Sequence, residues 1–192
     1  MGLSVRSFIA LELPHPLSEG LSALSDTLPK GLRVVPDDDL HLTLAFLGDA
    51  SESALQDIAD DLDTLTSDPI ALGVTGIGTF GSGDMVRSVN AIVQPTDALS
   101  ALQTKVIRIA RNAGLGLPRR KFLPHITLAR RTERPPEAAL SAWLLAHTTH
   151  KTPPVWATRG VLFRSDLTGN GPIYTALSEF EFSPDYAAWE WD

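Results

Sequence analysis

One four-residue pattern occurs twice in the 192-residue chain and constrains its fold more than any other feature. His41-Leu42-Thr43-Leu44 is matched by His125-Ile126-Thr127-Leu128, which lies 84 positions later (125 − 41). Apolar residues alternate with His and Thr, and this alternation is typical of a β-strand that is buried on one side. Residues i and i+2 of a strand point to the same face, so each copy places an imidazole beside a hydroxyl on an apolar backing.

The segments that follow the two motifs also correspond. Each motif strand is followed by a break and then by a helix, which starts near Ser51 in the first half and near Pro136 in the second. The repeated order predicts a bilobal, pseudo-twofold arrangement in which both motif strands line a central cleft. Strands and helices do not alternate one for one, so we expect an α+β fold with mostly antiparallel sheets and the helices outside. No Gly-, Ser- or Pro-rich linker divides the chain, and residues 1–192 are expected to form a single domain.

Hydrophobic periodicity places the remaining elements. We expect helices over residues 16–28, 51–65, 96–112 and 135–147. We expect strands over residues 4–13, 40–47, 69–80, 85–93, 122–130, 152–164 and 172–182, with turns at 81–84 and 165–171. Strict alternation puts Phe46 on the face of Leu42 and Leu44, which predicts a core position for this ring. By the same rule Arg130 need not share the face of His125, and we expect it to reach a ligand from the end of its strand.

Charge is distributed unevenly along the chain. The formal net charge is −7 at pH 7, which argues against non-specific binding of duplex nucleic acid, because such binding requires a basic surface. The window from Lys105 to Arg134 nevertheless holds nine of the sixteen basic residues, and its only acid is Glu133. A local positive field around the second motif suits an anionic substrate of limited size. For Lys105, Arg108 and Arg111 we favour a solvated helix face, because their spacing fits one side of a helix.

The absence of cysteine excludes disulfides, thiolate catalysis and cysteine metal sites. No apolar run has the length of a membrane span. The apolar run at residues 8–13 is interrupted by Glu12 and is too short for the core of a signal peptide. We therefore expect a soluble cytoplasmic protein without membrane contact, and we expect it to be a monomer.

Two facing His-x-Thr strands can bind a phosphate and carry out acid–base chemistry on it. Opening a cyclic phosphodiester requires a base that takes a proton from water and an acid that protonates the departing oxygen. Histidine serves in both roles near neutral pH, because its ordinary pKa is about 6.5. In-line attack puts the two oxygens on opposite sides of phosphorus, so His41 and His125 should bracket it. The hydroxyls of Thr43 and Thr127 can donate to the non-bridging oxygens.

Four segments together resemble the 2H phosphoesterase superfamily and, within it, the RNA 2′,3′-cyclic phosphodiesterases, which are also called 2′-5′ RNA ligases. These segments are residues 6–11 (RSFIAL), 40–48 (LHLTLAFLG), 124–130 (PHITLAR) and 171–174 (GPIY). A single His-x-Thr would carry little weight, but two in matching contexts are a strong signal. The resemblance extends over almost the whole chain.

The resemblance implies a 2H phosphoesterase fold and the metal-independent hydrolysis of RNA 2′,3′-cyclic phosphate ends to 2′-phosphates, without a cofactor. It assigns His41 as general acid and His125 as general base, whereas the symmetric residues themselves leave this assignment open. Thr43, Thr127 and Arg130 would bind the substrate. The implied partners are RNA 3′ ends or small cyclic-phosphate nucleotides. The reverse reaction, 2′-5′ RNA ligation, is implied as well.

Three alternatives stay open. The acidic run Asp37-Asp38-Asp39 could bind a divalent ion together with the two histidines, although successive acids in a turn point in different directions and Thr is a poor partner in such a site. The chain could be a non-catalytic module that binds RNA termini, but binding alone would not need two proton-transfer groups. It could also be a phosphodiesterase that acts on a small cyclic nucleotide rather than on an RNA end.

Overall fold

The computed structural model describes residues 4–81, 86–132, 136–169 and 171–182. Its elements are β1 (Ser4–Glu12), α1 (His15–Ser25), β2 (Leu32–Val34), the 3₁₀ turn η1 (Asp37–Asp39), β3 (His41–Ser51), α2 (Glu52–Asp63), β4 (Ile70–Leu72), β5 (Val74–Phe80), β6 (Ser88–Val93), α3 (Asp97–Asn112), β7 (His125–Arg131), α4 (Glu137–His147), β8 (Val155–Ala157), β9 (Arg159–Thr168) and β10 (Gly171–Glu181).

One eight-stranded antiparallel sheet forms the centre of the protein. Its strand order is β10-β9-β1-β3-β7-β6-β5, and β2 also pairs with β7. The two motif strands β3 and β7 are neighbours in the middle of this order, where Leu42 is paired with Ile126. β4 and β8 form a separate two-stranded antiparallel ladder. The predicted α+β fold with mostly antiparallel pairing is therefore confirmed.

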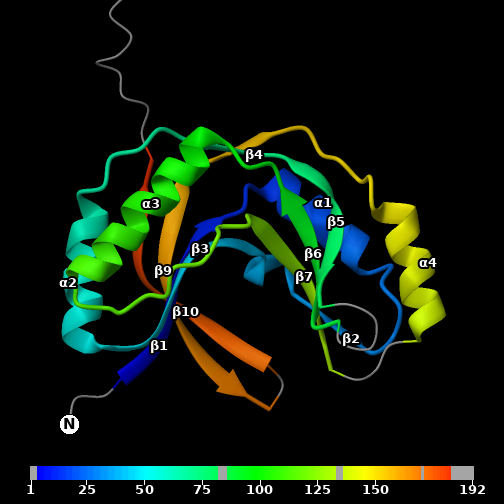
Figure 1. Ribbon diagram of the computed structural model, residues 1–192, viewed down its shortest axis with the longest axis horizontal. Coiled ribbons are helices and arrows are strands. Elements are labelled where there is room, and N and C mark those ends of the chain that lie inside the picture. Colours follow the sequence, from blue (N-terminus) through cyan, green and yellow to red (C-terminus); the bar gives the residue numbers. More distant parts are fainter. Residues whose placement is uncertain (1–3, 82–85, 133–135, 170, 183–192) are drawn as a thin grey trace, which may run out of the picture.

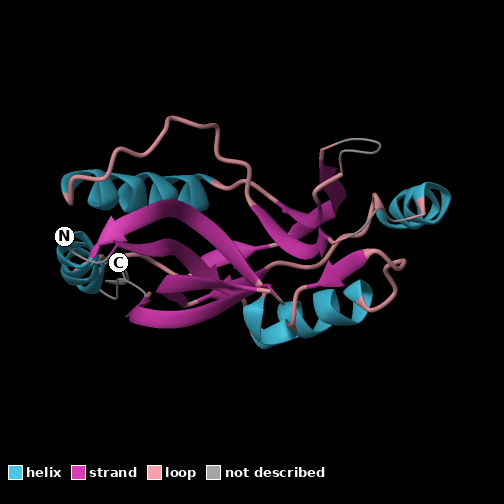
Figure 2. Cartoon of the chain, turned by 90° about the horizontal axis from the view of Figure 1, so that it is seen from below, coloured by secondary structure: helices cyan, strands magenta, loops and turns pink. Residues whose placement is uncertain are grey.

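The two halves of the sheet carry their helices as two lobes (Figure 1). α2 and α3 pack on the lobe that contains β3, whereas α1 and α4 pack on the lobe that contains β7 and β5. In each half the helix that precedes the motif strand packs on the opposite lobe, and the helix that follows it packs on the same lobe. The sequence repeat is thus a pseudo-twofold repeat in space. Figure 2 shows the strands in the middle and the helices around them.

The helices form where the sequence supplies both a cap and an apolar stripe. The side chain of Ser51 accepts a hydrogen bond from the backbone N–H of Ala54 and caps α2, as its position predicts. Thr96 caps α3 in the same way, through the backbone N–H of Leu99. The stripe of α3 is buried against the sheet, with Leu99, Leu102 and Val106 almost inaccessible to solvent. No helix in the described part of the chain is both long enough and apolar enough to cross a membrane.

Several predicted strand boundaries were wrong. The first motif strand does not end at Gly48 but continues to Ser51, and Gly48 adopts a positive φ of 70° beside a shift in the register with β1. Such a bulge absorbs an extra residue, and glycine tolerates the required backbone conformation. Residues 69–80 are not one strand, because the chain leaves the β4–β8 ladder at Gly73 and joins the main sheet as β5.

The C-terminal strands also differ from the prediction. Residues 152–164 divide at Thr158 into β8 and β9, which belong to different sheets. The loop expected over residues 165–171 is mostly strand, since the antiparallel ladder continues to the pair Thr168–Gly171. Shorter differences occur elsewhere: α1 ends at Ser25, and β7 begins only after Pro124, whose ring nitrogen cannot donate to a ladder. The turn expected at 81–84 falls largely outside the described residues, as does the acidic aromatic tail from Ser183.

Candidate active site

The pairing of β3 with β7 sets each motif histidine across from the threonine of the other motif. Continuing the antiparallel register by one residue from Leu42 and Ile126 puts His41 opposite Thr127 and Thr43 opposite His125. The two paired apolar side chains are fully buried, and the four polar side chains point to the other face of the sheet. The structure thus brings the four predicted residues together, with the two histidines on a diagonal.

Both imidazoles are oriented by the same kind of hydrogen bond. Nδ1 of His41 lies 2.7 Å from the carbonyl oxygen of Asp39, and Nδ1 of His125 lies 2.8 Å from that of Leu123. A carbonyl oxygen can only accept, so Nδ1 carries a proton in each ring. Each neutral imidazole therefore keeps its lone pair on Nε2, which becomes the atom that exchanges a proton.

The environment favours the neutral form of both histidines. The pKa of His41 is lowered to about 4, mainly by burial and to a smaller extent by the positive charge of Arg130, while the hydrogen bond to the Asp39 carbonyl acts in the opposite direction. Burial also lowers the pKa of His125, and the charge of Arg130 acts in the same direction. His125 also contributes to the lowered pKa of His41. The free protein thus presents two neutral imidazoles close to a cation, which is a site ready to accept an anion.

Aromatic rings account for much of the burial around the histidines. The ring of His41 lies 4.9 Å from that of Phe8 and 5.3 Å from that of Tyr174, which meets it edge-on. Phe163 stacks on Phe8 from the neighbouring strand β9. Sequence reasoning gave these rings no role, because they come from β1, β9 and β10, and only the sheet order brings them to β3. On the other lobe, Phe80 meets His125 edge-on at 4.6 Å.

Two β-bulges decide which further side chains reach the histidine face. Leu44 and Ala45 are both buried although they are consecutive, and the register between β3 and β1 shifts at this point. The bulge resets the alternation, so that Phe46 returns to the face of His41. The predicted core position of Phe46 is therefore wrong: the residue is 65% exposed and lines the cavity beside His125.

The second motif strand has the corresponding bulge at Leu128 and Ala129, where the register with β6 shifts. Arg130 pairs with Ser88 on β6. Ser88 points to the same face as Asn90, which is the β6 partner of Thr127. Arg130 thus shares the face of His125 and lies near the end of β7. It lies five positions after its histidine, as Phe46 does in the first motif, so the two occupy equivalent places in the repeat.

A cavity of about 720 Å³ opens beside this site. Thr43 and His125 line it together with residues of α3 and of the segment 117–123. The three cations for which a solvated helix face is predicted have different surroundings in the structure. Lys105 donates a hydrogen bond to the carbonyl oxygen of Thr66 at 3.1 Å. Arg108 and Arg111 line the cavity. The basic window around the second motif is therefore connected to the candidate site.

The acidic run 37–39 forms the 3₁₀ turn η1, which Leu40 separates from His41. It contributes to the site through the backbone carbonyl of Asp39. Within the described ranges, no three His, Cys, Asp or Glu side chains converge in a way that could hold a metal ion. Asn90 on β6 is fully buried and is the register partner of Thr127 on the second motif strand, and its Oδ1 has no hydrogen-bond partner among the described atoms.

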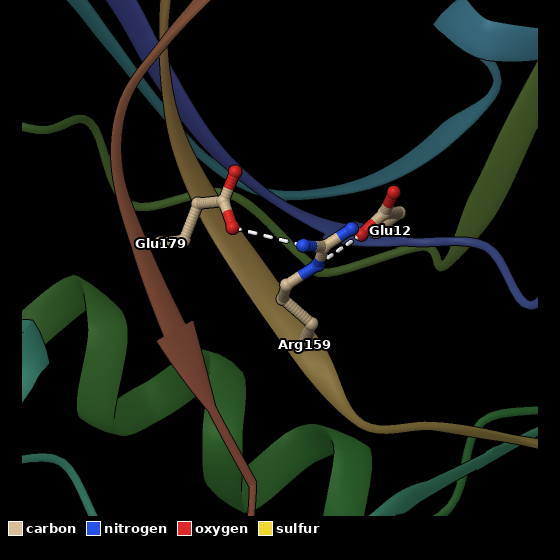
Figure 3. A network of polar contacts seen from close by, with 3 residues as sticks. All are labelled: Glu12, Arg159 and Glu179. Carbon is tan, nitrogen blue, oxygen red and sulfur yellow. Dashed lines mark hydrogen bonds and ion pairs between the residues drawn. The ribbon is translucent and has the colours of Figure 1, made fainter.

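A polar network connects the outer strands beside His41 (Figure 3). Arg159 on β9 donates from Nε to Glu12 on β1 and from Nη1 to Glu179 on β10, the latter at 2.8 Å. Glu12 is the register partner of His41, so this network engages the carboxylate that stands opposite that histidine in the β1–β3 ladder. The pKa of Arg159 is raised by its hydrogen bond to Glu12.

Comparisons with known proteins find relatives over most of the chain. A family model described as "LigT like Phosphoesterase" matches residues 11–89 and 92–174. The "RNA 2',3'-cyclic phosphodiesterase" of Methanothermobacter thermautotrophicus is 30% identical over 184 residues, which cover 93% of this chain and 99% of that protein. The protein of the same name from Thermus thermophilus is 30% identical over 198 residues, covering 95% of this chain and 92% of the relative.

The crystal structure of the Thermus thermophilus protein TT0787 has the same fold. It superposes with a TM-score of 0.73 at 27% sequence identity, over 92% of this chain and 97% of that one. The resemblance to the 2H phosphoesterases is thereby confirmed. The match to the family model extends over most of the chain and includes both His-x-Thr strands, so the chain belongs to the LigT-like phosphoesterase family.

Proposed function

We propose that this protein hydrolyses RNA 2′,3′-cyclic phosphate ends to 2′-phosphates, with His41 and His125 as its proton-transfer groups and without a metal. The observation that carries the proposal is the diagonal placement of two neutral imidazoles across the β3–β7 pair, each opposite a threonine of the other motif. The names of the relatives, which are RNA 2′,3′-cyclic phosphodiesterases, support the same substrate.

The diagonal suits in-line displacement at phosphorus. Side chains on diagonal positions of an antiparallel pair are separated by roughly 7–8 Å at their Cα atoms, which leaves room for a phosphate between the two rings. His125 Nε2 takes a proton from water as the water oxygen attacks phosphorus. The bond from phosphorus to the ribose 3′-oxygen breaks, and His41 Nε2 gives that oxygen a proton. The product is a 2′-phosphate and a free 3′-hydroxyl.

His41 must take up a proton from solvent at Nε2 before it can act as an acid, and the bound substrate favours this uptake through its negative charge. A cyclic phosphate is an anion, and an anion between the rings raises the pKa of both, which opposes the effect of Arg130. Arg130 then faces a negative charge rather than two imidazoles and can bind a non-bridging oxygen. Thr43 and Thr127 donate to the non-bridging oxygens, where negative charge grows in the transition state.

The proposal extends to the setting of the reaction. The substrates are RNA 3′ ends or small cyclic-phosphate nucleotides, and ligation of 2′-5′ RNA is the same chemistry in reverse, with a ribose hydroxyl in place of water. The protein acts as a cytoplasmic monomer of one domain.

The test is an assay in EDTA on an oligoribonucleotide that ends in a 2′,3′-cyclic phosphate. We expect the wild type to form the 2′-phosphate, and we expect His41→Gln and His125→Gln each to lower kcat by about 10²–10⁴-fold, since each removes a positioned acid or base. His147→Gln is the matched control, because the Nδ1 of His147 bonds the carbonyl oxygen of Trp143 in α4, outside the cavity.

Each other outcome would contradict the proposal in a defined way. Activity that EDTA abolishes and a divalent ion restores would mean metal chemistry. Binding of the cyclic end without turnover would mean a recognition module. A 3′-phosphate product would mean that the other ester bond is broken.

A further inference from the structure

The cavity beside His125 is larger than a terminal cyclic phosphate requires. Its volume of about 720 Å³ falls in the range that holds ligands of several rings. The motif strands supply only a part of its wall, through Thr43, Leu44 and His125 among others. Much of the remainder comes from one face of α3 and from the segment 117–123, which leads into β7. The cavity therefore extends from the site of chemistry toward these two elements.

The part of the wall that lies away from the histidines is strongly positive. Five exposed cations line it, namely Arg108 and Arg111 from α3, and Arg119, Arg120 and Lys121 from the opposing segment, and none of the described residues adds a carboxylate. None of the five forms an ion pair with another residue in the described part of the chain. In a protein with a net charge of −7, this is a local concentration of uncompensated positive charge. Such a concentration in a cavity attracts a polyanion of limited width.

Aromatic rings accompany the cations. Phe46 lines the same cavity and is 65% exposed, and the partly buried Phe80 and Phe122 line it as well. A ring left in solvent beside arginines is the arrangement that binds single-stranded nucleic acid, because bases stack on the ring while phosphates meet the cations. These five cations share one cavity of an acidic protein and do not form a broad basic surface, which a duplex would need.

We propose that this cavity binds the single-stranded RNA that precedes the cyclic end. In this RNA track, Phe46 stacks on a base near the reacting phosphate, and the five cations of α3 and segment 119–121 bind the phosphates farther upstream. The inference rests on the proposed function for the position of the 3′ end. It adds a preference for an oligonucleotide over a cyclic mononucleotide, which the chemistry at phosphorus does not require.

The first experiment needs only the wild type. It compares kcat/KM for a 2′,3′-cyclic mononucleotide and for oligoribonucleotides of increasing length with the same cyclic end, at several salt concentrations. We expect kcat/KM to rise with length until the track is filled. The gain should weaken with salt, with a slope of about −0.7 in log kcat/KM against log salt for each phosphate bound.

Variants then assign the gain to residues. We expect Arg108→Ala/Arg111→Ala and Arg119→Ala/Arg120→Ala to reduce the ratio of kcat/KM for oligonucleotide to that for mononucleotide, roughly fivefold for each phosphate that the variant no longer binds. Phe46→Ala should reduce kcat/KM for the oligonucleotide by roughly fivefold or more. The matched control is Lys30→Ala/Lys151→Ala, which removes two exposed cations outside the cavity and should keep the wild-type ratio.

The outcomes separate this inference from the proposed function. Equal kcat/KM for mononucleotide and oligonucleotide at low salt would overturn the RNA track while leaving the phosphodiesterase intact. A length preference that survives both double substitutions would overturn it too. If the wild type hydrolyses neither substrate, the proposed function fails. Equilibrium binding of a fluorescent oligoribonucleotide then tests whether the cavity binds RNA. Weaker binding by the two arginine variants than by the lysine control supports the RNA track, and equal binding overturns it.

Discussion

Leu42 lies directly across from Ile126 at the centre of the sheet, and both side chains are completely buried. They are the second residues of the two motifs, so the pair joins equivalent points of the repeat. Because strand neighbours alternate in direction, burying this pair in the core turns the histidine before and the threonine after each residue toward the opposite face. One apolar contact thereby fixes the relative position of four polar side chains.

Truncating a side chain of this pair should lower both the stability of the fold and the activity of the protein. We expect Leu42→Ala to lower the free energy of unfolding by about 2–5 kcal/mol, because it leaves a cavity between the motif strands. Urea denaturation at neutral pH measures the change. Leu145→Ala is the control, since Leu145 is 82% exposed on α4 and its truncation should change stability by less than about 0.5 kcal/mol. Equal losses in the two variants would contradict the central position of the pair.

The threonine hydroxyls should act mainly on kcat. We expect Thr43→Val and Thr127→Val each to lower kcat by about 10²-fold with little change in KM, because the donated hydrogen bonds strengthen as charge develops on the non-bridging oxygens. Thr43→Ser and Thr127→Ser keep the hydroxyl and should retain most of the activity. Steady-state kinetics on the cyclic-phosphate oligonucleotide decide this, and a rise in KM at constant kcat would assign the hydroxyls to ground-state binding.

The half-buried His41 should make the fold sensitive to acid. Its pKa is about 4 in the folded protein against 6.5 ordinarily, so the unfolded chain binds more protons between these values. The stability that comes from keeping this ring neutral is present above pH 6.5 and is lost as the pH falls toward 4, by about 3 kcal/mol over the whole range.

His41→Gln has no imidazole to protonate at this position and should lose less stability on acidification than the wild type. Urea denaturation of both proteins at neutral pH and at about pH 4.5 gives the comparison. The carboxylates titrate in both proteins, so their contribution cancels in the comparison, and His125 is present in both. Parallel losses of stability would show that His41 titrates normally in the fold.

Arg130 should hold down the pKa of both histidines. Its charge contributes to the lowered pKa of His41 and of His125, so we expect Arg130→Gln to raise both in the free protein. The pKa of His41 should stay below 6.5, because burial is the largest cause of its shift. NMR titration of the imidazole resonances measures this without substrate. Lys151→Gln removes an exposed cation outside the cavity and should leave both values in place; unchanged values in Arg130→Gln would place its charge too far from the rings.

Much of the site could be predicted because strand alternation is a local property. His41 and Thr43 share a face in any regular strand, and so do His125 and Thr127, whatever the rest of the chain does. The helices were predicted for the same reason, since a stripe with a cap such as Ser51 is visible in a short window. The repeat of the motif added the one non-local prediction, that the two strands meet at a central cleft.

The two β-bulges could not be predicted from strand alternation. Strict alternation placed Phe46 in the core, yet the extra residue at Leu44 and Ala45 turns its ring into the cavity. The same device brings Arg130 to the histidine face. A bulge is a mismatch in length between two paired strands, so it is decided by the partner strand and leaves little trace in the bulged sequence itself.

The sequence by itself determined that this chain has two equivalent His-x-Thr strands, an α+β architecture and a basic window around the second motif, since each follows from residue types at fixed spacing. Tertiary structure alone decided that each histidine faces the other motif's threonine and that rings from β1, β9 and β10 enclose His41. It also decided that the arginines of α3 line the cavity beside His125. The physical reason is that pKa, burial and charge complementarity depend on contacts between segments far apart in the chain, and only the order and register of the strands set those contacts.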